Sequence, residues 1–93
     1  MKLLYSPPAS KYLKKIKDKR LRKEFFETID KILANPTIGK PKKGDLKGRL
    51  CYGFYYDRTE YRVSYRVINN ETLLIVTVGT HENFYRDLKR YLK

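Results

Sequence analysis

The sequence predicts an α+β protein in which helices pack on one face of a largely antiparallel, four-stranded sheet, in the order β-α-α-β-β-β-α. Apolar residues recur at helical spacing in the first third of the chain and again near its end. Between these stretches, apolar and polar residues alternate with the two-residue period of strands. We expect residues 1–93 to form a single domain, because this length is enough for one modest core.

The first third of the chain is predicted to hold a short strand and two helices. Residues 3–5 read as the strand, and Ser6 caps a helix whose first position is Pro7, where a missing N–H does no harm. The apolar face of this helix consists of Ala9, Tyr12, Leu13 and Ile16. The next helix has an apolar face in a different register, made of Leu21, Phe25, Ile29, Ile32 and Leu33. We therefore place a joint near residues 17–20 and end the second helix at Asn35, before Pro36.

The rest of the chain is predicted to hold a loop, three strands and a last helix. Residues 35–48 contain two Pro and three Gly and form the loop. The strands are expected at 50–56, 61–67 and 73–78, the last of them apolar enough to be buried on both faces. A tight turn is expected at Asn69-Asn70. The last helix begins near Thr80, and its apolar face consists of Phe84, Leu88, Tyr91 and Leu92.

The composition favours a partner that carries negative charge. The chain has 22 Lys and Arg against 10 Asp and Glu, which gives a net charge of +12. An excess of this size attracts polyanions such as nucleic acid, although a merely soluble basic surface is the alternative explanation. A single Cys and a single His allow neither an internal disulfide nor a zinc site, and we expect no metal and no cofactor.

No apolar stretch approaches the roughly 20 residues of a membrane span. The segment that precedes Pro7-Pro8 is too short for a signal peptide. We therefore expect a cytoplasmic protein without a membrane partner. The sequence also lacks a glycine-rich phosphate loop, a nucleophile elbow and a paired-carboxylate motif, which argues against kinase, esterase and glycosidase chemistry.

One strand places two arginines on the same face. Arg62, Ser64 and Arg66 alternate with an apolar row, so they share the face opposite to it. Two guanidinium groups at this spacing form a plausible cradle for a phosphate. The alternative is a solvated strand face whose arginines pair with acids.

Further basic residues surround this strand in the sequence. The loop and the residue before the next strand supply candidate RNA-binding side chains, namely Lys40, Lys42, Lys43, Lys47 and Arg49. A second basic group lies on the two helices and is suited to a phosphate backbone or an acidic partner. It consists of Lys11, Lys14, Lys15, Lys17, Lys19, Arg20, Arg22 and Lys23. Runs of this kind are also common on surfaces that are simply solvated.

His81 and several tyrosines are the remaining candidates. His81 is expected at the start of the last helix, where the helix dipole favours neutral imidazole, a form that accepts a proton. Tyr85 lies one helical turn further on. A capping or surface role is the alternative for His81. Tyr61, Tyr65 and Tyr91 are expected in the core, whereas Tyr55, Tyr56 and Tyr85 are available to stack on bases.

The order of elements and four segments of the sequence resemble the RelE/ParE superfamily of toxins from toxin–antitoxin modules. The segments are Met1-Lys2-Leu3-Leu4-Tyr5-Ser6, Leu46-Lys47-Gly48, Tyr61-Arg62-Val63-Ser64-Tyr65-Arg66-Val67 and Val78-Gly79-Thr80-His81. The strand with two arginines and the Gly-Thr-His turn are the more specific of these. The resemblance covers essentially the whole chain.

The resemblance implies a toxin that inhibits translation as a metal-independent endoribonuclease (an mRNA interferase) acting on mRNA in the ribosome. In the RelE and YoeB branches the 2′-hydroxyl attacks the neighbouring phosphate. Arg62 matches the strand arginine that stabilises this phosphate, His81 falls where these nucleases carry Arg or His, and Tyr85 matches a tyrosine of the C-terminal helix. The same resemblance implies a cognate acidic antitoxin that wraps the first two helices and the sheet.

The sequence also departs from the nuclease branches. RelE-like members carry lysines along the strand where this chain has residues 50–56, and YoeB-like members have a glutamate where this chain has Lys40 before Pro41. The general base is therefore left open among Lys47, Arg49 and a neutral His81. A ParE-like, noncatalytic inhibitor of DNA gyrase is the main alternative, and a basic binding module without activity is a third.

Overall fold

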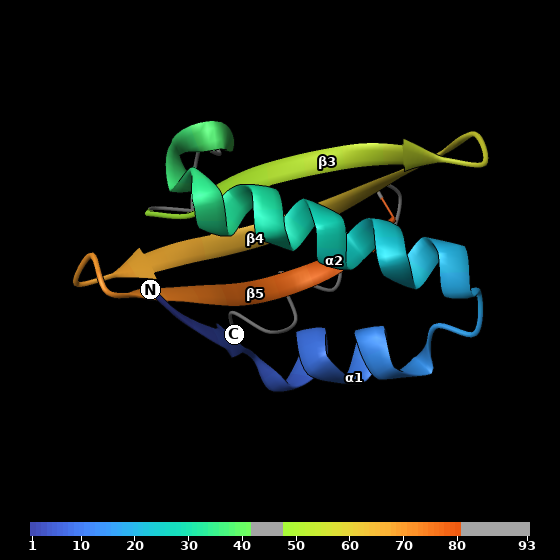
Figure 1. The fold of residues 1–93 in the computed structure, drawn as a ribbon, viewed down its shortest axis with the longest axis horizontal. Coiled ribbons are helices and arrows are strands. Elements are labelled where there is room, and N and C mark those ends of the chain that lie inside the picture. Colours follow the sequence, from blue (N-terminus) through green and yellow to red (C-terminus); the bar gives the residue numbers. More distant parts are fainter. Residues whose placement is uncertain (42–47, 81–93) are drawn as a thin grey trace.

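The computed structural model describes residues 1–41 and 48–80. Within them a five-stranded sheet has the strand order β1-β5-β4-β3-β2 (Figure 1). The elements are β1 (Lys2–Tyr5), α1 (Pro7–Lys15), α2 (Lys19–Ala34), the 3-10 turn η1 (Pro36–Ile38), β2 (Lys40–Pro41), β3 (Leu50–Tyr56), β4 (Thr59–Ile68) and β5 (Thr72–Thr80). Strand β1 is parallel to β5, and all other pairs are antiparallel.

The expected α+β class and the largely antiparallel sheet are confirmed. The strand count is not, because Lys40 and Pro41, expected in a loop, pair with Cys51 and Leu50 to add a fifth strand at the edge. Proline is tolerated at such an edge because its missing N–H faces away from the ladder. Thr80, expected to open the last helix, is still part of β5, and the remainder of that helix lies outside the described residues.

Both helices begin at the expected caps. The Ser6 hydroxyl oxygen accepts a hydrogen bond from the Ala9 N–H at 3.2 Å and its O–H donates to the Val76 carbonyl, which ties the start of α1 to β5. Asp18 caps α2 by accepting hydrogen bonds from the backbone N–H groups of Arg20 and Leu21. The joint between the helices thus falls within the predicted segment, and α2 ends at Ala34, just before Asn35 and Pro36.

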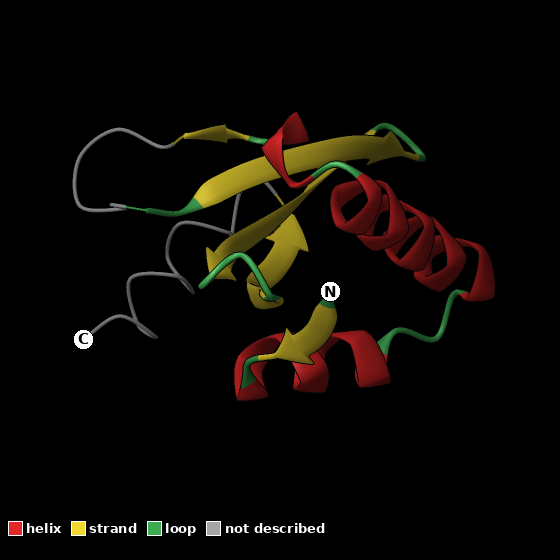
Figure 2. Cartoon of the chain, turned by 60° about the vertical axis from the view of Figure 1, so that its left-hand side comes forward, coloured by secondary structure: helices red, strands yellow, loops and turns green. Residues whose placement is uncertain are grey.

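The core lies between the helices and one face of the sheet, in which α1 contacts β5 and α2 contacts β3 (Figures 1 and 2). Ten buried residues form it: Ala9, Leu13, Phe25, Ile29, Ile32, Val63, Tyr65, Leu73, Ile75 and Val78. The ring of Phe25 makes edge contacts with Tyr12, Phe54 and Tyr61 at centroid distances of 4.9–5.9 Å. Tyr65 is fully buried, and Tyr61 packs against the core from its margin, so both have the core position expected of them.

Two tight turns and a bulge set the register of the sheet. Asn69 and Asn70 both have positive φ, as the predicted turn requires, and Asp57 and Arg58 adopt the same conformation between β3 and β4. A bulge shifts the β4–β5 register between Ser64 and Tyr65. In the part of the chain that the structure describes, no helix is long and apolar enough to cross a membrane.

Candidate functional site

The candidate site lies on the face of the sheet that points away from α1 and α2, which we call the distal face. Because side chains alternate along β4, Arg62, Ser64 and Arg66 point away from the core residues Val63 and Tyr65. The predicted grouping of the two arginines on one face is therefore present. Arg66 is exposed, whereas the side chain of Arg62 is only 26% exposed.

Arg62 is paired with an acid that the sequence analysis did not single out. Its Nη2 lies 2.8 Å from Oε2 of Glu60, two residues earlier on the same face, and the Glu60 side chain is 25% exposed. The arginine Nε is buried and has no hydrogen-bond partner among the described residues. A buried donor without a partner is costly in a folded protein, and such groups gather at sites that bind ligands.

Two glycines flank Arg62 in the sheet. Its cross-strand partners are Gly53 on β3 and Gly79 on β5, so neither directly paired position has a side chain. A Cβ at residue 53 would lie 2.8 Å from the Tyr61 carbonyl oxygen and 3.4 Å from Cγ of Arg62. Gly53 thus leaves room for the arginine stem and for the adjacent ion pair.

A hollow of about 410 Å³ opens beside this pair. The side chains that give it its character are Lys40, Cys51, Tyr55, Glu60 and Arg62, together with the bare backbone of Gly53. The ring of Tyr55 is 75% exposed, and on the sheet its residue is directly opposite Glu60. Two cations and one acid around a hollow of this size suit an anionic group with an unpaired base beside it.

A buried polar row lies next to the hollow. Cys51, Ser64 and Thr77 are cross-strand neighbours on β3, β4 and β5, and each is at most 6% exposed. The Ser64 hydroxyl is buried without a hydrogen-bond partner among the described residues, and so is Nε of Arg49, just before β3. The distal face therefore holds three buried, unpartnered polar atoms, on Arg49, Arg62 and Ser64.

The other predicted site residues divide into two groups. Lys40 lines the hollow, and Arg49 is partly buried at the start of β3. Lys42, Lys43, Lys47, His81 and Tyr85 lie outside the described residues. Within the described residues no group of three His, Cys, Asp or Glu is arranged to hold a metal ion.

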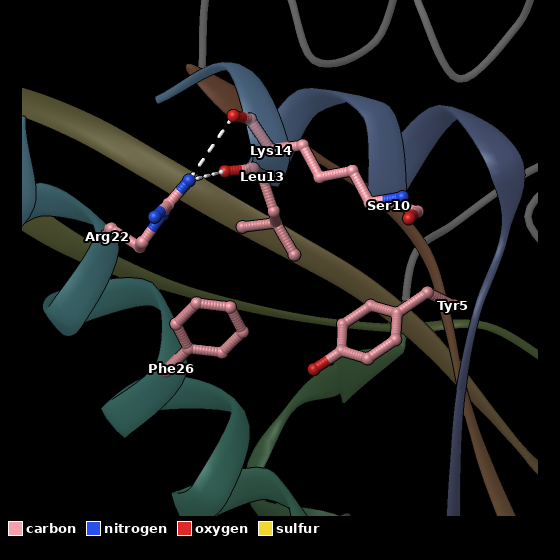
Figure 3. Close-up of a pocket in the computed structure, with 6 residues that line it drawn as sticks. All are labelled: Tyr5, Ser10, Leu13, Lys14, Arg22 and Phe26. Carbon is pink, nitrogen blue, oxygen red and sulfur yellow. Dashed lines mark hydrogen bonds between the residues drawn. The ribbon is translucent and has the colours of Figure 1, made fainter. Parts of the chain in front are cut away.

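A second hollow, of about 260 Å³, lies in the layer of helices (Figure 3). The rings of Tyr5 and Phe26 and the side chain of Leu13 give it an apolar lining. Arg22 closes one side by donating hydrogen bonds from Nη2 to the carbonyls of Leu13, at 3.4 Å, and Lys14, at 3.2 Å. We call this hollow the α1–α2 groove.

Comparison with solved structures identifies the fold as that of the RelE toxins. The toxin in the intact E. coli RelBE toxin–antitoxin complex is 23% identical with a TM-score of 0.65, over 84% of this chain and 93% of that one. A free mutant of E. coli RelE is 19% identical with a TM-score of 0.74, over 97% and 90%. The Mycobacterium tuberculosis RelBE2 complex gives 23% identity and a TM-score of 0.67, over 86% and 96%.

The profile of the ParE-like toxins of type II bacterial toxin–antitoxin systems matches residues 3–89. The chain belongs to this family, and the resemblance to the RelE/ParE superfamily is thereby confirmed. No curated protein matches the chain by sequence.

Proposed function

We propose that this toxin is an endoribonuclease that cuts mRNA in the ribosome and so inhibits translation, with Arg62 as the residue that stabilises the scissile phosphate. The observation that carries the proposal is the setting of Arg62. Its guanidinium group lies between two glycines at the edge of a hollow, with one buried N–H donor that has no partner among the described residues.

The chemistry requires a cation at this point. When a 2′-hydroxyl attacks the adjacent phosphate, negative charge grows on the non-bridging oxygens, and a fixed guanidinium stabilises it through two parallel hydrogen bonds. Lys40, Arg49 and Arg66 are placed to hold the flanking phosphates, since Lys40 lines the hollow and both arginines are near the polar row of the distal face. We assign Lys42, Lys43 and Lys47 to the same RNA-binding role on the basis of their sequence.

His81 and Tyr85 complete the proposed site. We propose that His81 exchanges a proton with the reacting oxygens and that Tyr85 orients the substrate or stacks on it. Both follow β5 directly in the sequence, and β5 is the strand that pairs with Arg62 through Gly79.

We also propose a cognate acidic antitoxin as the partner that silences the toxin. The chain carries a net charge of +12, and the α1–α2 groove combines an apolar lining with the cations Lys14 and Arg22. The groove suits an amphipathic segment whose acidic side chains meet these cations. The E. coli and M. tuberculosis structures that resemble this chain are toxin–antitoxin complexes.

Inhibition of DNA gyrase without catalysis is the second candidate. The matching family is described as ParE-like, and the β3 residues that line the hollow are Cys51, Tyr52, Gly53 and Tyr55, without a lysine. On this alternative the basic distal face binds a protein or DNA, and the geometry around Arg62 has no catalytic purpose.

The test is a cell-free translation reaction with purified toxin, in which the 5′ ends of the mRNA are mapped with and without ribosomes. The proposal predicts cuts that need ribosomes and that disappear in Arg62→Ala and His81→Ala. Arg20→Ala is the matched control, because it removes the same charge from an exposed position in the helical layer. Intact mRNA with a folded wild-type protein would reject the nuclease, and inhibition of gyrase supercoiling in a parallel reaction would then support the alternative.

A further inference from the structure

We infer that Glu60 is the general base, the group that removes the proton from the attacking 2′-hydroxyl of the RNA. The inference rests on the proposed nuclease and assigns the one role that the sequence left open. It starts from a contact on the distal face, where Oε2 of Glu60 lies 2.8 Å from Nη2 of Arg62 and both side chains line the same hollow.

The first argument is chemical. An ionised carboxylate carries only acceptors, whereas the side chains of arginine and of protonated lysine carry only donors. The hollow is lined by Lys40 and Arg62 as cations, and Glu60 is the one acid that lines it in the described part of the chain. The carboxylate is therefore the side chain in this hollow best suited to accept a proton.

The second argument is geometric. The attacking 2′-oxygen and the scissile phosphate are close neighbours in the substrate, so a base and a phosphate-binding cation must also be neighbours. Arg62 uses Nη2 for Glu60, while its Nε has no partner among the described residues and is available for a phosphate oxygen. One guanidinium group can thus hold the phosphate with one edge and orient the carboxylate with the other.

The third argument is space. A Cβ at position 53 would lie 3.7 Å from Oε2 of Glu60, in ordinary van der Waals contact with the carboxylate. Because residue 53 is glycine, that side of the carboxylate is not covered by the directly paired residue. A ribose can therefore approach Glu60 from β3.

The step balances as follows. The carboxylate of Glu60 takes the 2′-hydroxyl proton as the 2′-oxygen forms a bond to phosphorus. The bond from phosphorus to the 5′-oxygen breaks, and the leaving 5′-oxygen receives a proton from water or from a general acid. The products are a 2′,3′-cyclic phosphate and a free 5′-hydroxyl, with no change in oxidation state and no metal required.

Glu60→Gln tests this role against mere positioning of Arg62. The amide oxygen of glutamine still accepts a hydrogen bond from the guanidinium group, but glutamine takes up no proton. In single-turnover cleavage by ribosome-bound toxin, we expect Glu60→Gln to slow the reaction by about 10²- to 10⁴-fold, the usual contribution of a general base. We also expect the acid limb of the pH–rate profile to disappear, which loss of positioning alone would not cause.

Two further variants complete the design. Glu60→Asp keeps a carboxylate and should keep the acid limb at a reduced rate, which guards against a Gln variant that folds poorly. Glu71→Gln removes a carboxylate from the turn before β5, away from the hollow, and should cleave like the wild type.

The outcomes separate the two proposals. If the wild type cleaves and Glu60→Gln cleaves equally fast with an unchanged pH profile, Glu60 is not the base, and the nuclease stands. If the wild type leaves mRNA intact, the nuclease itself fails, and the role of Glu60 fails with it. A substrate whose leaving 5′-oxygen is replaced by sulfur should not rescue Glu60→Gln. Rescue would place Glu60 on the leaving group and overturn the assignment.

Discussion

The hydroxyl of Tyr65 accepts a hydrogen bond of 2.9 Å from the backbone N–H of Gly39. The same hydroxyl donates to the carbonyl of Pro36 at 2.6 Å, so a fully buried side chain of β4 holds the turn that leads into β2. A Cβ at residue 39 would lie 2.5 Å from this oxygen, which explains why a glycine is needed here. Through this contact the core fixes the strand that carries Lys40 to the hollow.

Tyr65→Phe should lower the free energy of unfolding by about 1–3 kcal/mol, because it leaves the Gly39 N–H without its buried partner. Urea unfolding measures the change. Tyr55→Phe removes the same atom from a side chain that is 75% exposed and should stay within about 0.5 kcal/mol of the wild type. Equal effects in the two variants would contradict this role of Tyr65.

The stability of the protein should also fall at alkaline pH through Tyr65. Burial raises the pKa of its phenol above the ordinary value, and the N–H of Gly39 offsets this only partly. A raised pKa in the folded state gives stability that is fully present below about pH 10 and is lost as the pH rises further. Thermal unfolding between neutral pH and the alkaline range should therefore show a steeper decline for the wild type than for Tyr65→Phe.

Gly53→Ala should damage the site more than its size suggests. The new Cβ would lie 2.8 Å from the Tyr61 carbonyl oxygen, so the backbone beside Arg62 must move. We expect a loss of stability of about 1–3 kcal/mol and a larger fractional loss of cleavage than of folded protein. Gly48→Ala is the contrast, because its cost arises from a φ of +72° with no atom within 4 Å. If Gly48→Ala impaired cleavage as strongly, crowding at Arg62 would not be the cause.

Arg58→Gly should stabilise the protein. Arg58 has a φ of +65° in the tight turn between β3 and β4, a conformation that costs an ordinary side chain about 1 kcal/mol and glycine little. Urea unfolding should show a gain of roughly this size. Arg58→Ala keeps the backbone penalty and should leave stability within about 0.5 kcal/mol, so a comparable gain in that variant would point to charge rather than conformation.

Tyr55→Ala should weaken binding of single-stranded RNA by about tenfold, since stacking on an aromatic ring contributes about 1–3 kcal/mol for each base. The measurement is fluorescence anisotropy with an RNA whose 2′-hydroxyls are methylated and which is therefore not cleaved. Tyr55→Phe should bind like the wild type. Phe26→Ala removes another exposed ring, from the helical layer, and a loss of affinity there would show that RNA does not select the distal face.

Local patterns were sufficient to predict the helices and the central strands. Ser6 and Asp18 cap their helices from positions that the change in apolar register already marked, and the paired asparagines form the turn before β5. Strand β2 was missed because two residues that include Pro41 carry no period, and their pairing depends on the distant Cys51 and Leu50.

The candidate site was only partly predictable for a similar reason. The two-residue period placed Arg62 and Arg66 on one face, and the same period extended by one step would have included Glu60. The importance of Gly53 could not be inferred, because it depends on the register between β3 and β4. Ser64 was grouped with the outward-pointing arginines, yet it is fully buried, a result of tertiary packing that alternation alone does not encode.

The parallel pairing of β1 with β5 has a consequence for how the chain folds during synthesis. Ser6 and Val76, joined by a hydrogen bond, are 70 residues apart in sequence, so β1 has no strand to pair with until β5 has been made. Contacts this distant in sequence form late and slow the folding of a small protein. A nascent chain that ends before Thr72 should therefore leave the amides of β1 open to hydrogen exchange, and a cell should be spared an assembled sheet until translation of the toxin is nearly complete.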